Sequence, residues 1–165
     1  MLVFAAVLVV ALGETAGAVL SQLRPQTERY ARARIAANPG AHGMSGSAEY
    51  DAEVVARTLF TVEAGLSFLH THAEGLAPVV LLAGTLVATA VPSRGPCRLL
   101  YGLLTLGGLF PLGYLFYALA VLELGREAGV GLAERWVLTP LGSAVILALL
   151  GLVVALSHRG SDRPT

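Results

Sequence analysis

Two long stretches without a charged residue limit what this chain can fold into more than any other feature. Residues 99–122 form an uncharged run of 24 residues, and residues 137–157 form one of 21. About 20 apolar residues in an α-helix span the ~30 Å hydrocarbon core of a bilayer. Both stretches are therefore predicted to be membrane-spanning helices.

The composition of the whole chain supports a membrane protein. Of its 165 residues, 55% are hydrophobic and 13% are charged, whereas soluble domains carry about 25% charged residues. Eleven basic residues balance eleven acidic ones, so no excess positive charge favours nucleic acid as a partner. Cys97 is the only cysteine, which excludes an intrachain disulfide and a multi-cysteine metal site. We expect the lipid bilayer, and no nucleic acid, as a partner.

The N-terminal segment, residues 1–23, is predicted to be the first span. It is apolar apart from Glu14 and a few small polar residues. No basic residue precedes Arg24, whereas a cleaved signal peptide has a basic start and a short apolar region, so an uncleaved anchor is expected. Gly13 and Gly17 form a Gly-x-x-x-Gly pair, which lets a neighbouring helix approach closely.

The second span has to include polar residues. Residues 76–91 carry no charge, but these 16 residues are fewer than the ~20 that a membrane helix needs. The segment 92–96 contains two prolines and ends the helix on one side. The span is therefore expected to extend toward the N-terminus and to cover residues 70–91, which places His70 and His72 at one membrane boundary.

The connecting segments are predicted from their polarity. Residues 24–53 form a polar connector with an interfacial helix over 27–37, and His42 in its glycine-rich part is expected to be solvated. Residues 54–69 carry apolar side chains at spacings of three and four, which predicts an amphipathic helix or an additional span. Residues 123–135 are expected to form a short polar turn.

These segments predict a single, all-α integral membrane domain. Its most economical form is a four-helix transmembrane bundle with an amphipathic helix before the second span. The four predicted spans cover residues 1–23, 70–91, 99–122 and 137–157. A five-span bundle, in which residues 54–72 cross separately, is the alternative.

Arginine positions orient the chain, because cytoplasmic loops carry an excess of basic residues. With four spans and the N-terminus outside, seven arginines lie inside and four outside; with five spans, nine lie inside and two outside. Hydropathy favours four spans, because a fifth would carry Arg57, Glu63 and both histidines. Both arrangements place the N-terminus outside, and we expect the bacterial plasma membrane.

One polar stripe stands out in this apolar chain. Residues of an α-helix are about 100° apart, so four polar residues of the second helical region share one face. They are Glu63, Ser67, His70 and Glu74. His72 lies roughly 200° from His70 and points elsewhere. Ionisable groups at membrane depth are costly and usually functional, and we expect Glu14 of the first span to hydrogen-bond or share a proton with one of these residues.

Three functions are compatible with this stripe. The first is a redox-associated subunit that binds haem b or a transition metal, because a neutral imidazole is a common ligand of iron, copper and zinc. His70 and His72 would bind the cofactor, with Glu74 as an additional metal ligand. The second is a proton or ion path with Glu14 and Glu63 as relay groups. The third is a non-catalytic structural or assembly subunit of a membrane complex.

Enzymatic activity is not expected, and no catalytic residue is assigned. The chain contains neither a Gly-x-Ser-x-Gly elbow nor a glycine-rich phosphate motif. For a bound haem, a second axial histidine is missing from the predicted spans, since only His42 and His158 remain. A second ligand would have to come from another membrane subunit or from a homo-oligomer.

His-x-His at the start of an apolar helix resembles the paired histidines of haem–copper oxidase catalytic subunits. The motif from Gly13 to Gly17, followed by the one from Phe68 to His72, is similar to small, functionally uncharacterised bacterial membrane proteins that are distantly like that superfamily. The resemblance implies haem ligation by His70 and His72. The copper-site histidines of an oxidase have no counterpart in this chain, so the resemblance does not imply oxygen reduction.

Overall fold

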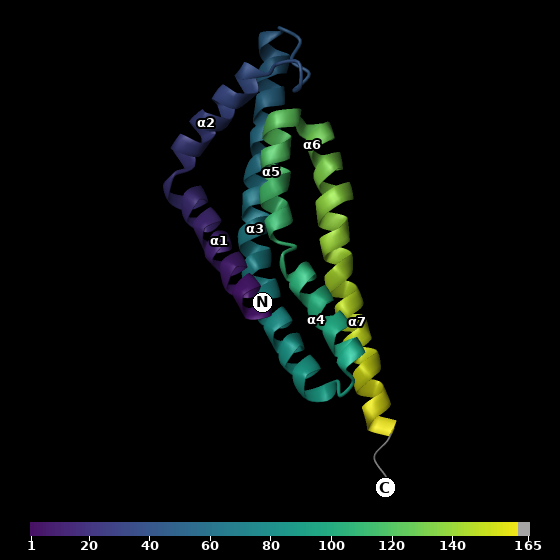
Figure 1. The fold of residues 1–165 in the computed structure, drawn as a ribbon. Coiled ribbons are helices and arrows are strands. Elements are labelled where there is room, and N and C mark those ends of the chain that lie inside the picture. Colours follow the sequence, from purple (N-terminus) through teal and green to yellow (C-terminus); the bar gives the residue numbers. More distant parts are fainter. Residues whose placement is uncertain (162–165) are drawn as a thin grey trace.

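The computed structural model describes residues 1–161, and in this part of the chain the fold is all-α (Figure 1). Four helical stretches are long and apolar enough to cross a membrane: Leu2–Gln22, Ala48–Ala90, Arg94–Leu124 and Arg126–His158. The prediction of an all-α membrane bundle with four spans is therefore confirmed.

The first two helices, α1 (Leu2–Gln22) and α2 (Arg24–Ala37), meet at the single residue Leu23. Pro25 stands in the first turn of α2, where its missing N–H group leaves no hydrogen bond unmade. The helix expected over residues 27–37 is present and begins slightly earlier. α2 turns away from α1 and leads to the end of the bundle at which α3 begins (Figure 1).

The longest helix, α3 (Ala48–Ala90), has 43 residues and is about 65 Å long at 1.5 Å per residue. It contains both the amphipathic segment 54–69 and the predicted span 70–91. No turn interrupts it, so the chain cannot reverse between these segments and the five-span alternative is not adopted. Asp51 in its first turn accepts hydrogen bonds from the backbone N–H groups of Ser45 and Gly46, at 2.8 and 3.0 Å.

The span predicted over residues 99–122 consists of two helices, α4 (Arg94–Gly108) and α5 (Leu112–Leu124). Between them the backbone bonds change to the i to i+3 type, as from the Phe110 N–H to the Gly107 carbonyl at 3.0 Å. Pro111 lacks the N–H that a continuous α-helix would use. The helix therefore breaks inside the span, which the uncharged run did not predict.

The last stretch combines α6 (Arg126–Ala133), the π-helical turn η1 (Glu134–Leu138) and α7 (Thr139–Ser161). The expected polar turn over residues 123–135 is shorter in the structure, because helix resumes at Arg126. The reversal takes place at Gly125, whose φ of 83° is unfavourable for other residues. A Cβ atom there would lie 2.1 Å from the Ala41 carbonyl oxygen.

Two hydrophobic clusters hold the helices together. One joins α1, α3, α4 and α7 around Val80, Val87 and Leu104, and the other joins α2, α3 and α5 around Ile35 and Val121. His42 packs beside the second cluster: its side chain is buried, and Nε2 lies 3.2 Å from the Leu122 carbonyl oxygen. The expectation that His42 is solvated is therefore wrong.

Candidate functional site

The glycine pair of α1 forms the contact between α1 and α3. A Cβ atom at Gly13 would lie 2.4 Å from the Cβ of Ala73, and one at Gly17 would lie 3.0 Å from the imidazole ring of His70. A side chain at Gly13 would require the helices to move apart, and one at Gly17 would require the imidazole ring of His70 to move. The Gly-x-x-x-Gly pair therefore brings the backbone of α1 directly onto α3 beside His70.

This contact assembles a cluster of three ionisable side chains. One ligand atom each of Glu14, His70 and Glu74 lies within 4.8 Å of the others. His70 Nε2 is 3.8 Å from Glu74 Oε1, one helical turn further along α3. Both carboxylates are exposed, whereas His70 is half-buried. Glu14 therefore lies close to His70 and Glu74 of the polar stripe, but the described residues include no hydrogen bond between Glu14 and the stripe.

The imidazole of this cluster has one ring nitrogen near a carboxylate and one that is enclosed. The His70 Nδ1 atom is buried and has no hydrogen-bond partner among the described residues. A proton on Nδ1 would be a buried N–H donor without an acceptor, which costs free energy. In the absence of a metal we therefore place the imidazole proton on Nε2, which faces Glu74.

Glu63, another member of the predicted stripe, belongs to a separate pair. Arg24 donates to both carboxylate oxygens of Glu63, from Nε at 3.1 Å and from Nη2 at 2.9 Å. The hydrogen bonds to Glu63 raise the pKa of the Arg24 guanidinium, so Arg24 stays charged. The structure therefore divides the stripe into an ion pair near α2 and the three-residue cluster near α1.

His72 lies on a different face of α3 from His70. Its Nδ1 is 2.9 Å from the Phe68 carbonyl oxygen. Because a carbonyl only accepts, Nδ1 carries the proton and Nε2 is left available. The rings of Phe68, Phe110 and Tyr114 surround the imidazole, with centroids at 5.9, 5.7 and 4.9 Å.

An apolar cleft adjoins His72 between α3 and α7. Its volume is about 480 Å³, and its lining includes Val79, Phe110, Gly142 and Ile146. Pockets of roughly 300–1,000 Å³ that combine an apolar lining with a few polar groups are typical small-molecule sites. His72 is the ionisable group of this cleft.

The predicted ligand set of His70, His72 and Glu74 is therefore not one site. The structure joins His70 and Glu74 with Glu14, which the sequence predicted as a relay group and as a partner of the polar stripe but not as a metal ligand. It also surrounds His72 with the aromatic rings of Phe68, Phe110 and Tyr114. The position of Glu14 next to Gly13, the close-contact glycine, was the available signal for its role.

We compared the chain with protein-family models, curated proteins and solved structures, and none of these comparisons gives a match. The resemblance to the haem–copper oxidase superfamily therefore stays a prediction. The functional inference depends on the geometry of the side chains alone.

Proposed function

We propose that this membrane protein is a small, redox-associated subunit that binds a divalent transition-metal ion where α1 crosses α3. The observation that supports this most is the convergence of Glu14, His70 and Glu74, whose ligand atoms come from two helices and lie within 4.8 Å of one another. One imidazole and two carboxylates form a mixed nitrogen and oxygen set, which suits Fe²⁺, Mn²⁺ or Zn²⁺.

A bound cation would be attracted by both carboxylates of the cluster, which come from two neighbouring helices. Three protein ligands leave coordination positions for water or for a group from a partner, either another membrane subunit or a second copy of the chain.

The proposed site is a weak and exchangeable one. A metal bound at Nε2 of His70 would shift the imidazole proton to Nδ1, which has no acceptor among the described residues. A metal-bound histidine normally donates a hydrogen bond from its other ring nitrogen, and loss of that bond typically lowers metal affinity about 10- to 100-fold.

A second candidate is haem b bound through His72. This residue has the arrangement usual for an axial ligand, with Nδ1–H bonded to a backbone carbonyl and Nε2 available. The apolar cleft between α3 and α7 lies beside it. The chain would then supply one axial ligand, and a partner the other.

We also propose that the protein lies in a bacterial plasma membrane with its N-terminus outside. α2 and the turn between α5 and α6 lie at one end of the molecule, opposite the connection between α3 and α4 (Figure 1). Among residues 1–161, seven arginines belong to the end with α2 and three to the other, so the end with α2 would face the cytoplasm.

Metal analysis and an absorption spectrum of the detergent-purified protein test both candidates. We expect a stoichiometric divalent metal after loading, which His70→Ala abolishes and which His72→Ala and the exposed control His158→Ala leave intact. A Soret band that only His72→Ala removes would establish the haem candidate instead. If the protein holds neither metal nor haem, both candidates are rejected, and a non-catalytic accessory subunit and a proton or ion path remain.

A further inference from the structure

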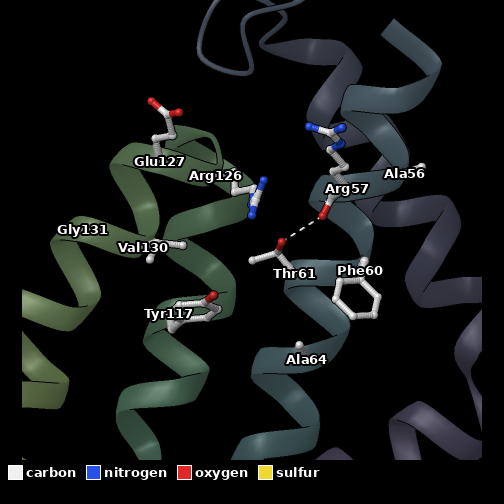
Figure 2. A pocket seen from close by; sticks show the side chains of 10 residues that line it. All are labelled: Ala56, Arg57, Phe60, Thr61, Ala64, Tyr117, Arg126, Glu127, Val130 and Gly131. Carbon is white, nitrogen blue, oxygen red and sulfur yellow. Dashed lines mark hydrogen bonds between the residues drawn. The ribbon is translucent and has the colours of Figure 1, made fainter. Parts of the chain in front are cut away.

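A second site lies nearer the arginine-rich end of the bundle, away from both histidines. A cleft of about 1000 Å³ opens between α3 on one side and α5 and α6 on the other (Figure 2). Two arginines, Arg57 of α3 and Arg126 of α6, line it together with Phe60, Ala64, Tyr117 and Val130. One region of the lining therefore contains two arginines and one acidic residue, Glu127, and the rest is mainly apolar.

The two arginines lie on facing sides of one end of the cleft. Figure 2 shows the Arg126 side chain directed toward α3 and the Arg57 guanidinium on the opposite side, whereas the Glu127 carboxylate points away. Within the part of the chain that the structure describes, Arg126 has no carboxylate at ion-pair distance. Arg57 pairs with Glu53, one turn back on α3, and its side chain is 64% exposed. Among the described residues, Arg126 therefore offers an unpaired positive charge at this end of the cleft, and Arg57, which bonds to Glu53 through Nη2, retains further N–H donors for an anion.

The apolar part of the cleft continues along α3 toward the membrane core. From Arg57 to Ala64 the helix advances about 10 Å at 1.5 Å per residue. Phe60 lies between them and is 74% exposed, and Tyr117 faces the same space from α5 (Figure 2). An exposed phenyl ring beside a cationic rim suits a ligand with a charged head and an apolar chain.

We propose that this cleft binds an anionic phospholipid, with its phosphate between Arg57 and Arg126 and an acyl chain along Phe60, Ala64 and Tyr117. The guanidinium group matches phosphate oxygens through paired N–H donors. Basic pockets between transmembrane helices on the cytoplasmic side are known to hold lipid head groups. The Thr61 hydroxyl already donates to the Arg57 carbonyl at 2.8 Å, so recognition of the phosphate depends mainly on the two arginines.

Lipid retention measured by native mass spectrometry tests this proposal. The detergent-purified full chain is titrated with phosphatidylglycerol and, separately, with phosphatidylcholine of the same acyl chains. We expect preferential binding of phosphatidylglycerol. Arg126→Gln should weaken it about fivefold, the effect of ~1 kcal/mol for one basic residue near a membrane surface, and Arg57→Gln should do the same.

Arg29→Gln is the matched control, because it removes one exposed arginine of α2 that does not line the cleft. It should leave lipid binding unchanged. Ala64→Trp fills the apolar part and should weaken lipid binding while both arginines remain. Circular dichroism and thermal unfolding establish that each variant is folded, and Arg126→Gln decides the question if Ala64→Trp does not fold.

Three results would overturn the proposal. Equal losses in Arg126→Gln and Arg29→Gln would show that only the overall charge matters. Equal retention of the two lipids would remove the role of head-group charge. Displacement of the lipid by millimolar inorganic phosphate, with no effect of Ala64→Trp, would identify a soluble anion as the ligand.

Discussion

His70 and His72 are two residues apart in one helix, yet their surroundings are opposite in character. His70 faces α1, with Gly17 against its ring and carboxylates of Glu14 and Glu74 nearby. His72 faces aromatic rings, and its Nδ1–H is bonded to the Phe68 carbonyl. His70 has two carboxylates nearby as candidate co-ligands, but its second ring nitrogen has no hydrogen-bond partner among the described residues. His72 has a hydrogen bond on its second ring nitrogen, but no carboxylate of the described residues beside it.

This difference follows from helical geometry. In a continuous α-helix, side chains two positions apart point about 200° from each other, so His-x-His cannot converge on one ion. Convergence requires residues three or four apart, as for His70 and Glu74, or residues from different helices, as for Glu14. The candidate metal site at His70 therefore depends on the close approach of α1 to α3, whereas the aromatic surroundings of His72 do not.

The largest effect is expected from separating α1 from α3. Gly13→Val places a side chain where even a Cβ atom would lie 2.4 Å from Ala73, and overpacking of this kind typically costs about 1–3 kcal/mol. Denaturant unfolding in detergent measures the loss of stability, and metal binding at His70 should disappear with it. Gly75→Ala is the control, because a Cβ atom there meets nothing within 4 Å. A Gly13→Val variant as stable as the unmodified protein would contradict the close crossing.

The next largest effect concerns the carboxylates. Glu14→Gln removes the ligand from α1, and we expect metal affinity to fall at least as much as for loss of an outer-shell partner, about 10- to 100-fold. Glu63→Gln is the matched control, because Glu63 is paired with Arg24. Titration calorimetry with Zn²⁺ or Mn²⁺ measures both variants. Equal losses would mean that the metal senses the total negative charge of α1 and α3 and not a defined ligand set.

A smaller effect is expected from His72→Phe. The phenyl ring keeps an aromatic group among Phe110 and Tyr114, so the change in unfolding free energy should stay within about 1 kcal/mol, the scale of a single aromatic pair. Metal binding at His70 should be unchanged, while any Soret band should vanish. Weaker metal binding in this variant would show that the two sides of α3 are coupled.

The features that could be predicted from the sequence are those that depend on a single helix. Run length and hydropathy were sufficient for four spans, and the helical period was sufficient to place His70 and Glu74 on one face and His72 on another. The continuity of α3 was not predictable from hydropathy, because a helix can extend beyond the apolar segment that crosses the membrane. The break at Pro111 likewise lies inside an uncharged run.

Contacts between distant segments were the least predictable. His42 is buried because its loop packs against Gly125 and bonds to the Leu122 carbonyl, 80 positions away. Its glycine-rich neighbourhood indicated only a solvated loop. The ion pair between Glu63 and Arg24 was not predicted either. Each residue alone is typical of an exposed helix surface, and nothing in the sequence indicates that the two lie together.

The smallest expected effect comes from Arg24→Gln. This variant tests whether the ion pair between Arg24 and Glu63 affects metal binding at His70. Exposed ion pairs contribute little to stability and are weakened by salt, and the Arg24 side chain is 64% exposed. We therefore expect a thermal unfolding midpoint close to that of the unmodified protein, with any difference decreasing at high salt, and unchanged metal affinity. The released Glu63 carboxylate lies two helical turns from His70, too far along α3 to replace Glu14 as a ligand. If Arg24→Gln nevertheless strengthened metal binding, the polar stripe would act as one electrostatic unit, and the division into two separate groups would be incorrect.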